Sequence, residues 1–324
     1  MTNQLLTTTE IRELASKLDL KPTKKLGQNF VTDQNTVEKI VRISNVTKDS
    51  HVLEVGPGLG SLTLALLATG AKVSAVEIDS RLAELLPITA KSKGFSDSSL
   101  SVINKDALEI TNNDVKNPDV LVANLPYNVS VPVIIHILEN FPSIKNYLVM
   151  VQSEVADRLA APPGSRTYGS PSVKLQWYAE VSKAGSISRN VFWPVPNVDS
   201  DLVHMNRRND IDETIRKELF AVVDAAFAQR RKMLRSALSS MCGGSEKASQ
   251  ILESAQIDPQ LRGEALNVSD YVRLTIAMKK SGITITSTHH RKSSCQNKFI
   301  AQSCTFRPRW FSSTSNCVSC GINI

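Results

Sequence analysis

The sequence has no apolar run that approaches the roughly 18 residues needed to cross a bilayer. Its first 20 residues carry Glu10, Glu13 and Asp19 and lack the apolar core of a secretory signal. The 324 residues are otherwise of ordinary globular composition, 41% hydrophobic and 21% charged. We therefore expect a cytoplasmic enzyme that does not enter a membrane and that folds as one large domain or two of moderate size.

Cysteine is scarce, and before the C-terminal segment it occurs only at Cys242. The other four lie at Cys295, Cys304, Cys317 and Cys320, where one C-x-x-C pair is the only feature typical of a zinc module. We therefore predict no metal site. Residues 281–324 also lack acidic side chains and carry five basic ones, which leaves +2 of the net charge of +7 for residues 1–280. This segment is predicted to be a basic, disordered tail rich in serine and cysteine.

Short apolar segments alternate with helical patterns between residues 51 and 151. Predicted strands cover 51–55, 72–77, 100–104, 120–123 and 146–151, and predicted helices cover 62–68, 81–86 and 132–138. Upstream, a short helix is expected near residues 11–18, and Asp33 is a candidate cap for a helix that carries Val37 and Ile40. This alternation predicts an α/β fold with a doubly wound, mostly parallel sheet covered on both faces.

The pattern changes after residue 152. Helices are expected at 155–159 and 173–177, strands at 181–187 and 202–206, and further helices at 215–227, 233–238 and 271–278. We found no internal repeat. The predicted organisation is a catalytic domain at 1–206, a small all-helical domain at 207–280 and the tail at 281–324.

A glycine-rich loop follows the first predicted strand of the alternating region. It reads Gly56-Pro57-Gly58-Leu59-Gly60, and glycine lets the backbone turn tightly and approach a ligand. The spacing is G-x-G-x-G and differs from the G-x-G-x-x-G of dinucleotide binders. Gly56 and Gly58 are therefore predicted to contact a cofactor that lacks a pyrophosphate, as S-adenosylmethionine does.

Polar side chains follow the next three strands. Glu77 can accept hydrogen bonds from both ribose hydroxyls, Asp106 can accept one from an adenine amine, and Asn124 ends the fourth strand. Asp79 is interpreted as a helix cap. Glu77 would also suit a nicotinamide-dependent enzyme, so the glycine spacing and the residues after the fourth strand must discriminate.

Asn124-Leu125-Pro126-Tyr127 is the most informative tetrad. An adenine N6 amine is a weak nucleophile because its lone pair is delocalised into the ring. The Asn124 oxygen and the carbonyl of Leu125 or Pro126 could accept from the N6 hydrogens and stabilise the positive charge that builds during methyl transfer. Pro126 would stiffen this turn, and Tyr127 would stack on an extruded base.

Together, six motifs resemble those of the KsgA-type ribosomal RNA adenine N6-dimethyltransferases, over residues 21 to about 278. They are Lys25-Leu26-Gly27-Gln28-Asn29-Phe30, Glu54-Val55-Gly56-Pro57-Gly58-Leu59-Gly60, Asn124-Leu125-Pro126-Tyr127-Asn128, Tyr168-Gly169, Phe192-Trp193-Pro194-Val195-Pro196-Asn197-Val198-Asp199-Ser200 and Phe227-Ala228-Gln229-Arg230-Arg231-Lys232.

The resemblance implies a Rossmann-like methyltransferase sheet with a reversed last strand and a C-terminal helical domain. It implies that Phe192 joins Tyr127 in sandwiching the target adenine, and that two adjacent adenosines near the 3′ end of small-subunit ribosomal RNA are dimethylated. Two residues depart from the family pattern: Val31 stands where leucine is common, and Pro171 stands where the family often has leucine, which we expect to shift the start of that helix. The implied contacts to S-adenosylmethionine are Asn29, Val31, Gly56, Glu77, Asp106 and Asn124.

Four basic residues, Arg230, Arg231, Lys232 and Arg235, crowd one segment that we expect to be helical, with positions 231 and 235 on one face. They are predicted to bind RNA phosphates, and Lys21, Lys24 and Lys25 could extend the patch. The expected partner is small-subunit ribosomal RNA within a pre-ribosomal particle, bound by a monomer.

Other functions remain open on the sequence alone. A large-subunit ribosomal RNA methyltransferase of the macrolide-resistance type and a DNA adenine methyltransferase share the chemistry. A ribosome-assembly factor for which methylation is secondary belongs to another class, and a nicotinamide-dependent oxidoreductase is a more distant alternative.

Overall fold

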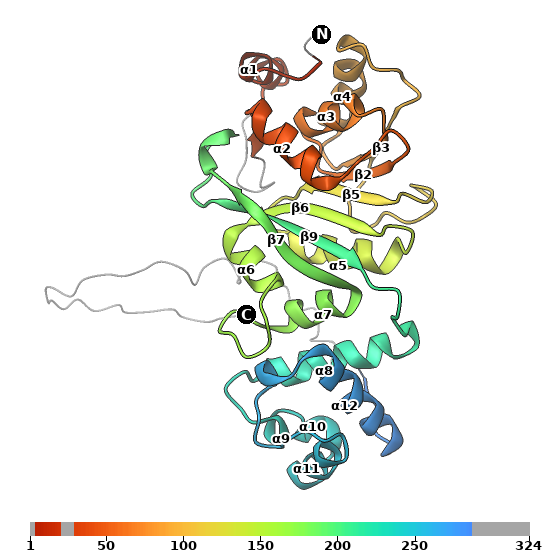
Figure 1. Ribbon diagram of the computed structural model, residues 1–324, viewed down its shortest axis with the longest axis vertical. Coiled ribbons are helices and arrows are strands. Elements are labelled where there is room, and N and C mark those ends of the chain that lie inside the picture. The colour runs from red at the N-terminus through yellow and green to blue at the C-terminus, as the bar shows by residue number, and fades with distance from the viewer. Residues whose placement is uncertain (1–3, 21–28, 287–324) are drawn as a thin grey trace, which may run out of the picture. The chain divides into compact units, whose positions relative to one another are not determined.

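The protein is described by a computed structural model that covers residues 4–20 and 29–286. Within these residues lies a seven-stranded sheet in the order β4-β3-β2-β5-β6-β9-β7 (Figure 1). Strands β2 to β6 run parallel, whereas β9 is antiparallel to both of its neighbours. The predicted mostly parallel sheet with a reversed last strand is confirmed. The strands are β2 (His51–Val55), β3 (Lys72–Glu77), β4 (Leu100–Asn104), β5 (Val120–Asn124), β6 (Asn146–Gln152), β7 (Ala179–Ile187) and β9 (Ser200–Arg207).

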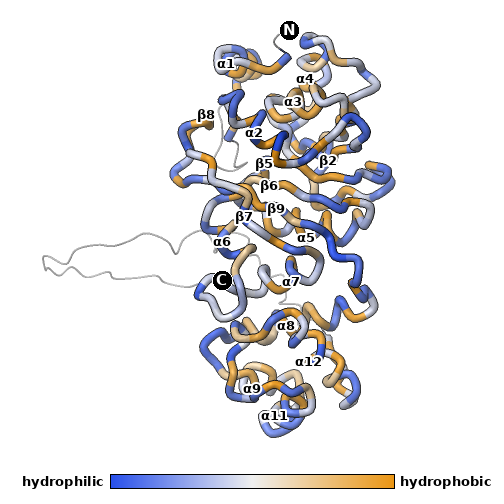
Figure 2. Tube along the Cα trace, viewed as in Figure 1, coloured by the Kyte–Doolittle hydropathy of each residue, from blue (hydrophilic) through white to orange (hydrophobic). Residues whose placement is uncertain are grey.

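Successive side chains of the central strands point to opposite faces of the sheet, and both faces are buried. On β2, Val52 packs in one hydrophobic cluster and Leu53 packs in the other. The neighbouring strands β5 and β6 are hydrophobic along most of their length (Figure 2). Such continuous apolar runs are typical of parallel strands with helices on both sides, which is why the sheet could be predicted.

Helices cover both faces of the sheet. Residues of α1, α2, α3 and α4 pack in one cluster, and residues of α5, α6 and α7 pack in the other. Asp33 and Asp79 cap α2 and α4, because their carboxylates accept from the backbone N–H of Thr36 at 2.8 Å and of Arg81 at 3.1 Å. The helices are α1 (Thr8–Lys17), α2 (Gln34–Ser44), α3 (Ser61–Ala68), α4 (Ser80–Ser92), α5 (Ser130–Asn140), α6 (Ser153–Leu159) and α7 (Ser170–Tyr178).

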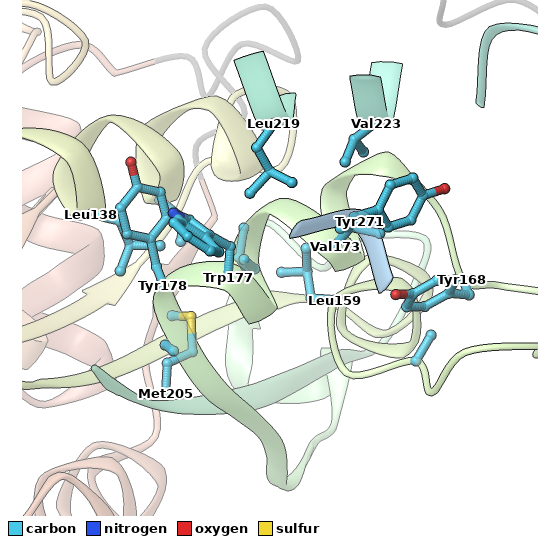
Figure 3. Packing of buried hydrophobic residues seen from close by; sticks show 14 of the residues in the cluster. Leu138, Leu159, Tyr168, Val173, Trp177, Tyr178, Met205, Leu219, Val223 and Tyr271 are labelled. Carbon is cyan, nitrogen blue, oxygen red and sulfur yellow. The ribbon is translucent and has the colours of Figure 1, made fainter. Parts of the chain in front are cut away.

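The region after β9 is helical, as predicted, and it shares a hydrophobic cluster with one face of the sheet. Leu219 and Val223 of α8 lie over Trp177 and Val173 of α7, and Tyr271 of α12 lies beside them (Figure 3). Residues 1–287 group as one compact unit, and the boundary expected between 206 and 207 stays a prediction. The helices are α8 (Arg216–Ala228), α9 (Leu234–Ala237), α10 (Ser239–Cys242), α11 (Ser245–Ser254) and α12 (Val268–Lys280), with 3-10 turns η1 (Arg189–Val191), η2 (Glu213–Ile215) and η3 (Gly263–Ala265).

A second, two-stranded sheet joins segments that are far apart in the sequence. β1 (Phe30–Val31) pairs antiparallel with β8 (Phe192–Trp193), and the rings of Phe30 and Trp193 stack with centroids 6.3 Å apart. The Thr32 N–H donates to the carbonyl of Val191 at 2.8 Å and extends the pairing. Strands of two residues carry no recognisable periodicity, so the sequence did not predict this pair.

The basic segment after α8 differs from the prediction. α8 ends at Ala228, residues 229–233 form a turn, and α9 begins at Leu234. The helix is interrupted because Leu234 is buried and its N–H donates to the carbonyl of Leu261 at 2.7 Å, which requires an extended Met233. The expectation of one helical segment is therefore wrong, although all four side chains are exposed as predicted: Arg230, Arg231, Lys232 and Arg235.

Several predicted features lie outside the described residues. They are the lysines at 21, 24 and 25, and residues 287–324 of the predicted tail with its four cysteines. Among the helices that the structure does describe, none combines the length and the apolar character needed to span a membrane.

Candidate functional site

A cavity of about 190 Å³ lies at the edge of the sheet where the parallel strands end. Its wall is built from the segments that follow β2, β3, β4 and β5, because the carboxyl ends of parallel strands meet at one edge. A fifth segment, residues 29–31 with β1, adds to the wall from outside the main sheet. Chain segments distant in sequence therefore converge on one space.

The glycine loop after β2 lies between the turn after β5 and β1. Gly56 has φ +71°, its N–H donates to the carbonyl of Val76 at 2.9 Å, and a Cβ there would lie 3.6 Å from the Pro126 ring. Gly58 has φ +57°, and a Cβ there would come within 2.8 Å of the Phe30 ring. Gly58 thus requires glycine for two reasons, its left-handed backbone and the close approach of Phe30.

Glu77 ends β3 with its carboxylate fixed by backbone donors. Oε2 accepts from the N–H of Gly58 at 3.1 Å, and Oε1 accepts from the N–H of Asp79 at 3.0 Å. Burial raises the pKa of Glu77, and these two N–H groups oppose the rise because they stabilise the ionised form. The carboxylate is therefore held in one orientation beside the glycine loop.

Asp106, after β4, is held in a similar way at the next position along the edge. Its Oδ1 accepts from the N–H of Leu108 at 2.9 Å. Lys105 also lines the cavity, but its ammonium group binds Asp114 at 3.0 Å. The side chains of Ile78 and Leu108 are largely exposed and line the same part of the cavity, where they offer apolar contact for a planar base.

Glu54 is a buried carboxyl group in the cavity wall to which the sequence analysis assigned no role. It is 1% exposed, and among the described residues its Oε2 has no hydrogen-bond partner. Burial raises the pKa of Glu54 to about 8, the charge of Glu77 adds to the rise, and the Thr63 hydroxyl opposes it. A carboxylate inside an otherwise apolar strand was the signal that could have identified it.

The turn after β5 presents two oxygen acceptors. The Asn124 side-chain N–H donates to the carbonyl of Asn29 at 3.0 Å, so the Asn124 oxygen faces away from that carbonyl. The carbonyl of Pro126 accepts from the N–H of Val129 at 3.2 Å, whereas no donor in the described chain reaches the carbonyl of Leu125. Of the two carbonyls that the sequence left open, Leu125 is therefore the one that is available.

The two aromatic residues predicted to hold the base are placed differently. Tyr127 lines the cavity, and its hydroxyl lies 2.8 Å from the hydroxyl of Ser200. Burial raises the pKa of Tyr127, so the phenol is neutral. Phe192 is 2% exposed, pairs with Val31 and is not part of the cavity wall, so its place in a sandwich with Tyr127 stays a prediction.

The structure brings together every other predicted cofactor and catalytic residue. Those in the cavity wall are Asn29, Val31, Gly56, Gly58, Glu77, Asp106, Asn124, Leu125, Pro126 and Tyr127. The exposed basic residues after α8 do not line this cavity.

The family model for ribosomal RNA adenine dimethylase matches residues 20–280. The chain belongs to this family. It is therefore a methyltransferase, which removes the nicotinamide-dependent oxidoreductase as an alternative, and the resemblance that the motifs indicated is confirmed.

Relatives and solved structures agree with membership of the adenine dimethylase family. The chain is 55% identical to ribosomal RNA small subunit methyltransferase A of Corynebacterium diphtheriae, over 84% of this chain and 94% of the relative. The protein of the same name from Streptomyces coelicolor is also 55% identical, over 83% and 96%.

Two crystal structures support the fold alone. A dimethyladenosine transferase from Plasmodium falciparum matches with a TM-score of 0.69 at 24% identity, over 79% of this chain and all of the other. The 23S ribosomal RNA methyltransferase ErmE matches with a TM-score of 0.59 at 23% identity, over 78% of this chain and all of the other.

Proposed function

We propose that this adenine dimethylase transfers methyl groups from S-adenosylmethionine to the N6 amines of two adjacent adenosines near the 3′ end of small-subunit ribosomal RNA. One observation carries the proposal. The Asn124 oxygen and the Leu125 carbonyl lie in the wall of the cavity that also holds Glu77 and Asp106. The names of relatives at about 55% identity support the small subunit as the source of the RNA.

The described residues fit S-adenosylmethionine. Glu77 would accept from the ribose hydroxyls, Asp106 would accept from the adenine amine, and Gly56 and Gly58 leave room for close approach of the backbone. The Glu54 oxygen that has no partner among the described residues is a further polar group in the same wall. When bound, the cofactor supplies an electrophilic methyl group on a positively charged sulfur.

Asn124 and Leu125 would act on the target amine. In the first transfer, two acceptors that bind both N6 hydrogens favour a pyramidal nitrogen whose lone pair leaves conjugation with the ring; in the second transfer one hydrogen remains for one acceptor. The acceptors also stabilise the positive charge on nitrogen as the C–N bond forms and the bond from the methyl group to sulfur breaks. An amide oxygen and a backbone carbonyl are too weakly basic to take the proton, so it leaves to water from the much more acidic alkylated amine.

Tyr127 would hold the base once it has left the RNA stack. Tyr127 directly follows Asn124, Leu125 and Pro126 in the sequence and lines the same cavity. Stacking of the base on its aromatic ring compensates for part of the stacking that the base loses when it leaves the RNA. Holding the nitrogen in line with the methyl group then contributes to the rate through orientation.

The exposed cations after α8 are the proposed RNA contacts. In the part of the chain that the structure describes, Arg231, Lys232 and Arg235 form no ion pair, so their charges are available to phosphates. Arg230 differs, because its guanidinium binds Glu264 at 2.8 Å and the carbonyl of Arg166 at 2.7 Å. We propose a cytoplasmic monomer that acts on a pre-ribosomal particle.

The decisive experiment incubates the protein with labelled S-adenosylmethionine and immature small subunits that lack the modification. Label is expected in N6,N6-dimethyladenosine. Asn124→Ala should lower turnover at least a hundredfold, because it removes a preorganised acceptor worth on the order of 10² in rate, while cofactor affinity stays within tenfold. Asn113→Ala, an exposed asparagine outside the cavity wall, is the matched control and should behave as the wild type.

Two outcomes would contradict this proposal. Turnover of Asn124→Ala at the wild-type rate would remove the role of the acceptor turn. Label that appears in immature large subunits and not in small subunits would assign the chain to the macrolide-resistance type of enzyme.

A further inference from the structure

Within the part of the chain that the structure describes, the hydroxyl of Ser200 is the one polar contact of the Tyr127 side chain. The two oxygens are 2.8 Å apart, and their residues are 73 positions apart in sequence. Ser200 is 0% exposed, so its hydroxyl is buried at the strand end while the Tyr127 ring reaches the cavity. A ring on a loop can swing about its Cα–Cβ bond, and this hydrogen bond restricts that motion; it does not restrict rotation about Cβ–Cγ, because the hydroxyl oxygen lies on that axis.

Ser200 is a rigid partner because of its place in the sheet. It begins β9 and pairs with Gln152 of β6 on one side and with Ile187 of β7 on the other. Its neighbour Asp199 accepts from the N–H of Ser153 through its carbonyl at 3.1 Å and from the N–H of Arg189 through its carboxylate at 3.0 Å. The serine backbone is thus fixed on both sides, whereas Tyr127 lies on a loop.

The reversal of β9 explains why these residues meet. β9 is antiparallel to β6, so the first residue of β9 lies at the edge where β5 and β6 end. Tyr127 follows β5 at that same edge. A parallel strand in this position would place its first residue at the opposite edge of the sheet.

We propose that Ser200 is a positioning residue for methyl transfer, which fixes the position of the Tyr127 ring against which the target adenine stacks. This inference rests on the proposed function. Without the bond, the ring can swing away from this position, the base is held less firmly, and the N6 amine spends less time in line with the methyl donor. Loss of the bond should lower kcat and leave the affinity for RNA nearly unchanged, because the proposed phosphate contacts lie elsewhere.

The test is a double-mutant cycle on kcat with Ser200→Ala, Tyr127→Phe and the double variant. One hydrogen bond joins the two side chains, so each of the three variants should lower kcat by a similar factor, about tenfold. Affinity for S-adenosylmethionine and for immature subunits should stay within twofold. Ser74→Ala is the matched control, because Ser74 is also buried in a strand and its hydroxyl lies 2.8 Å from the ring of His51.

A second readout does not depend on activity. The chain has five tyrosines, so protein labelled with 3-fluorotyrosine should give five fluorine resonances. Tyr127→Phe assigns the resonance of Tyr127 by its loss. Ser200→Ala should shift and broaden that resonance selectively, and Ser74→Ala should leave it unchanged.

Three results would overturn the inference: wild-type kcat in Ser200→Ala, wild-type kcat in Tyr127→Phe, or an unchanged Tyr127 resonance in Ser200→Ala. Failure of the proposed function is distinguishable from these. In that case Tyr127→Ala, which removes the ring itself, would also turn over at the wild-type rate, or the product would not be dimethyladenosine.

Discussion

At the scale of single residues, the cavity combines two buried carboxyl groups whose environments differ. Backbone N–H groups satisfy both oxygens of Glu77, whereas one oxygen of Glu54 has no partner among the described residues. Burial without such donors raises the pKa of Glu54 to about 8, far above the 4.5 of an unperturbed glutamate. The rise in the pKa of Glu54 is therefore not offset by backbone donors of the kind that bind Glu77.

Glu54 should make the free energy of unfolding depend on pH. Between pH 4.5 and about 8, folded Glu54 keeps a proton that the unfolded chain has released, so stability is highest below this window and falls as the pH rises through it. Glu54→Gln removes this contribution, which is on the order of a few kcal/mol. Denaturant unfolding at pH 5 and pH 8 should show a weaker decrease for the variant than for the wild type.

Glu38→Gln provides the control for this measurement, because Glu38 is an exposed glutamate on α2. The free energy of unfolding of this variant should fall between pH 5 and pH 8 by as much as that of the wild type. If Glu54→Gln lost as much stability between the two pH values as the wild type does, the raised pKa would be refuted.

At the scale of elements, the site depends on how closely β1 packs on the glycine loop. β1 has only two residues, yet Phe30 covers Gly58 and the preceding Asn29 carbonyl orients Asn124. The loop carries Gly56 and Gly58, two of the proposed cofactor contacts, and Asn124 is a proposed acceptor for the substrate amine. One short strand therefore links the two halves of the site.

Gly58→Ala should disturb this contact. Its φ of +57° costs alanine about 1 kcal/mol, and the new Cβ would also meet the Phe30 ring at 2.8 Å, which adds roughly 1–3 kcal/mol of overpacking. Gly94→Ala carries the same backbone cost at φ +88° with nothing within 4 Å, so it isolates the effect of the clash. Urea unfolding and calorimetric titration with S-adenosylmethionine should show Gly58→Ala to be less stable and weaker in binding than Gly94→Ala. Equal losses of stability and of cofactor affinity in the two variants would show that the Phe30 ring moves aside at no cost.

At the scale of the whole molecule, the exposed basic residues after α8 fall into two kinds. Arg230 is held by Glu264 and by the carbonyl of Arg166, so it joins three separate chain segments. Arg231 is exposed, and no ion pair is recorded for it within residues 29–286. We therefore expect Arg231 to contribute to RNA binding and Arg230 to contribute mainly to stability.

Arg231→Ala should weaken binding to immature small subunits and reduce the slope of log K against log salt by about 0.7–0.9, the value for one lost phosphate contact. Arg230→Ala should change this slope less and should instead lower the melting temperature, because it removes the bonds to Glu264 and Arg166. Binding measured at several salt concentrations separates the two. An unchanged slope in Arg231→Ala would place the RNA on another surface.

The sequence alone determined the features that depend on neighbouring residues. Runs of apolar residues predicted β2, β3, β5 and β6, because parallel strands buried on both faces need them. Asp33 and Asp79 were identified as caps because a cap acts within one turn of its own helix. Residues after successive parallel strands meet at one edge by topology, so Glu77, Asp106 and Asn124 could be placed together before any coordinates were known.

Only the tertiary structure decided the contacts between residues that are distant in sequence. The bond from Asn124 to Asn29 spans 95 positions and that from Tyr127 to Ser200 spans 73, and no local pattern encodes either. The break between α8 and α9 in the basic segment is not local either, because the buried Leu234 donates its N–H to the distant carbonyl of Leu261. Local chemistry thus placed the reacting groups at one edge of the sheet, and long-range packing determined which way they face.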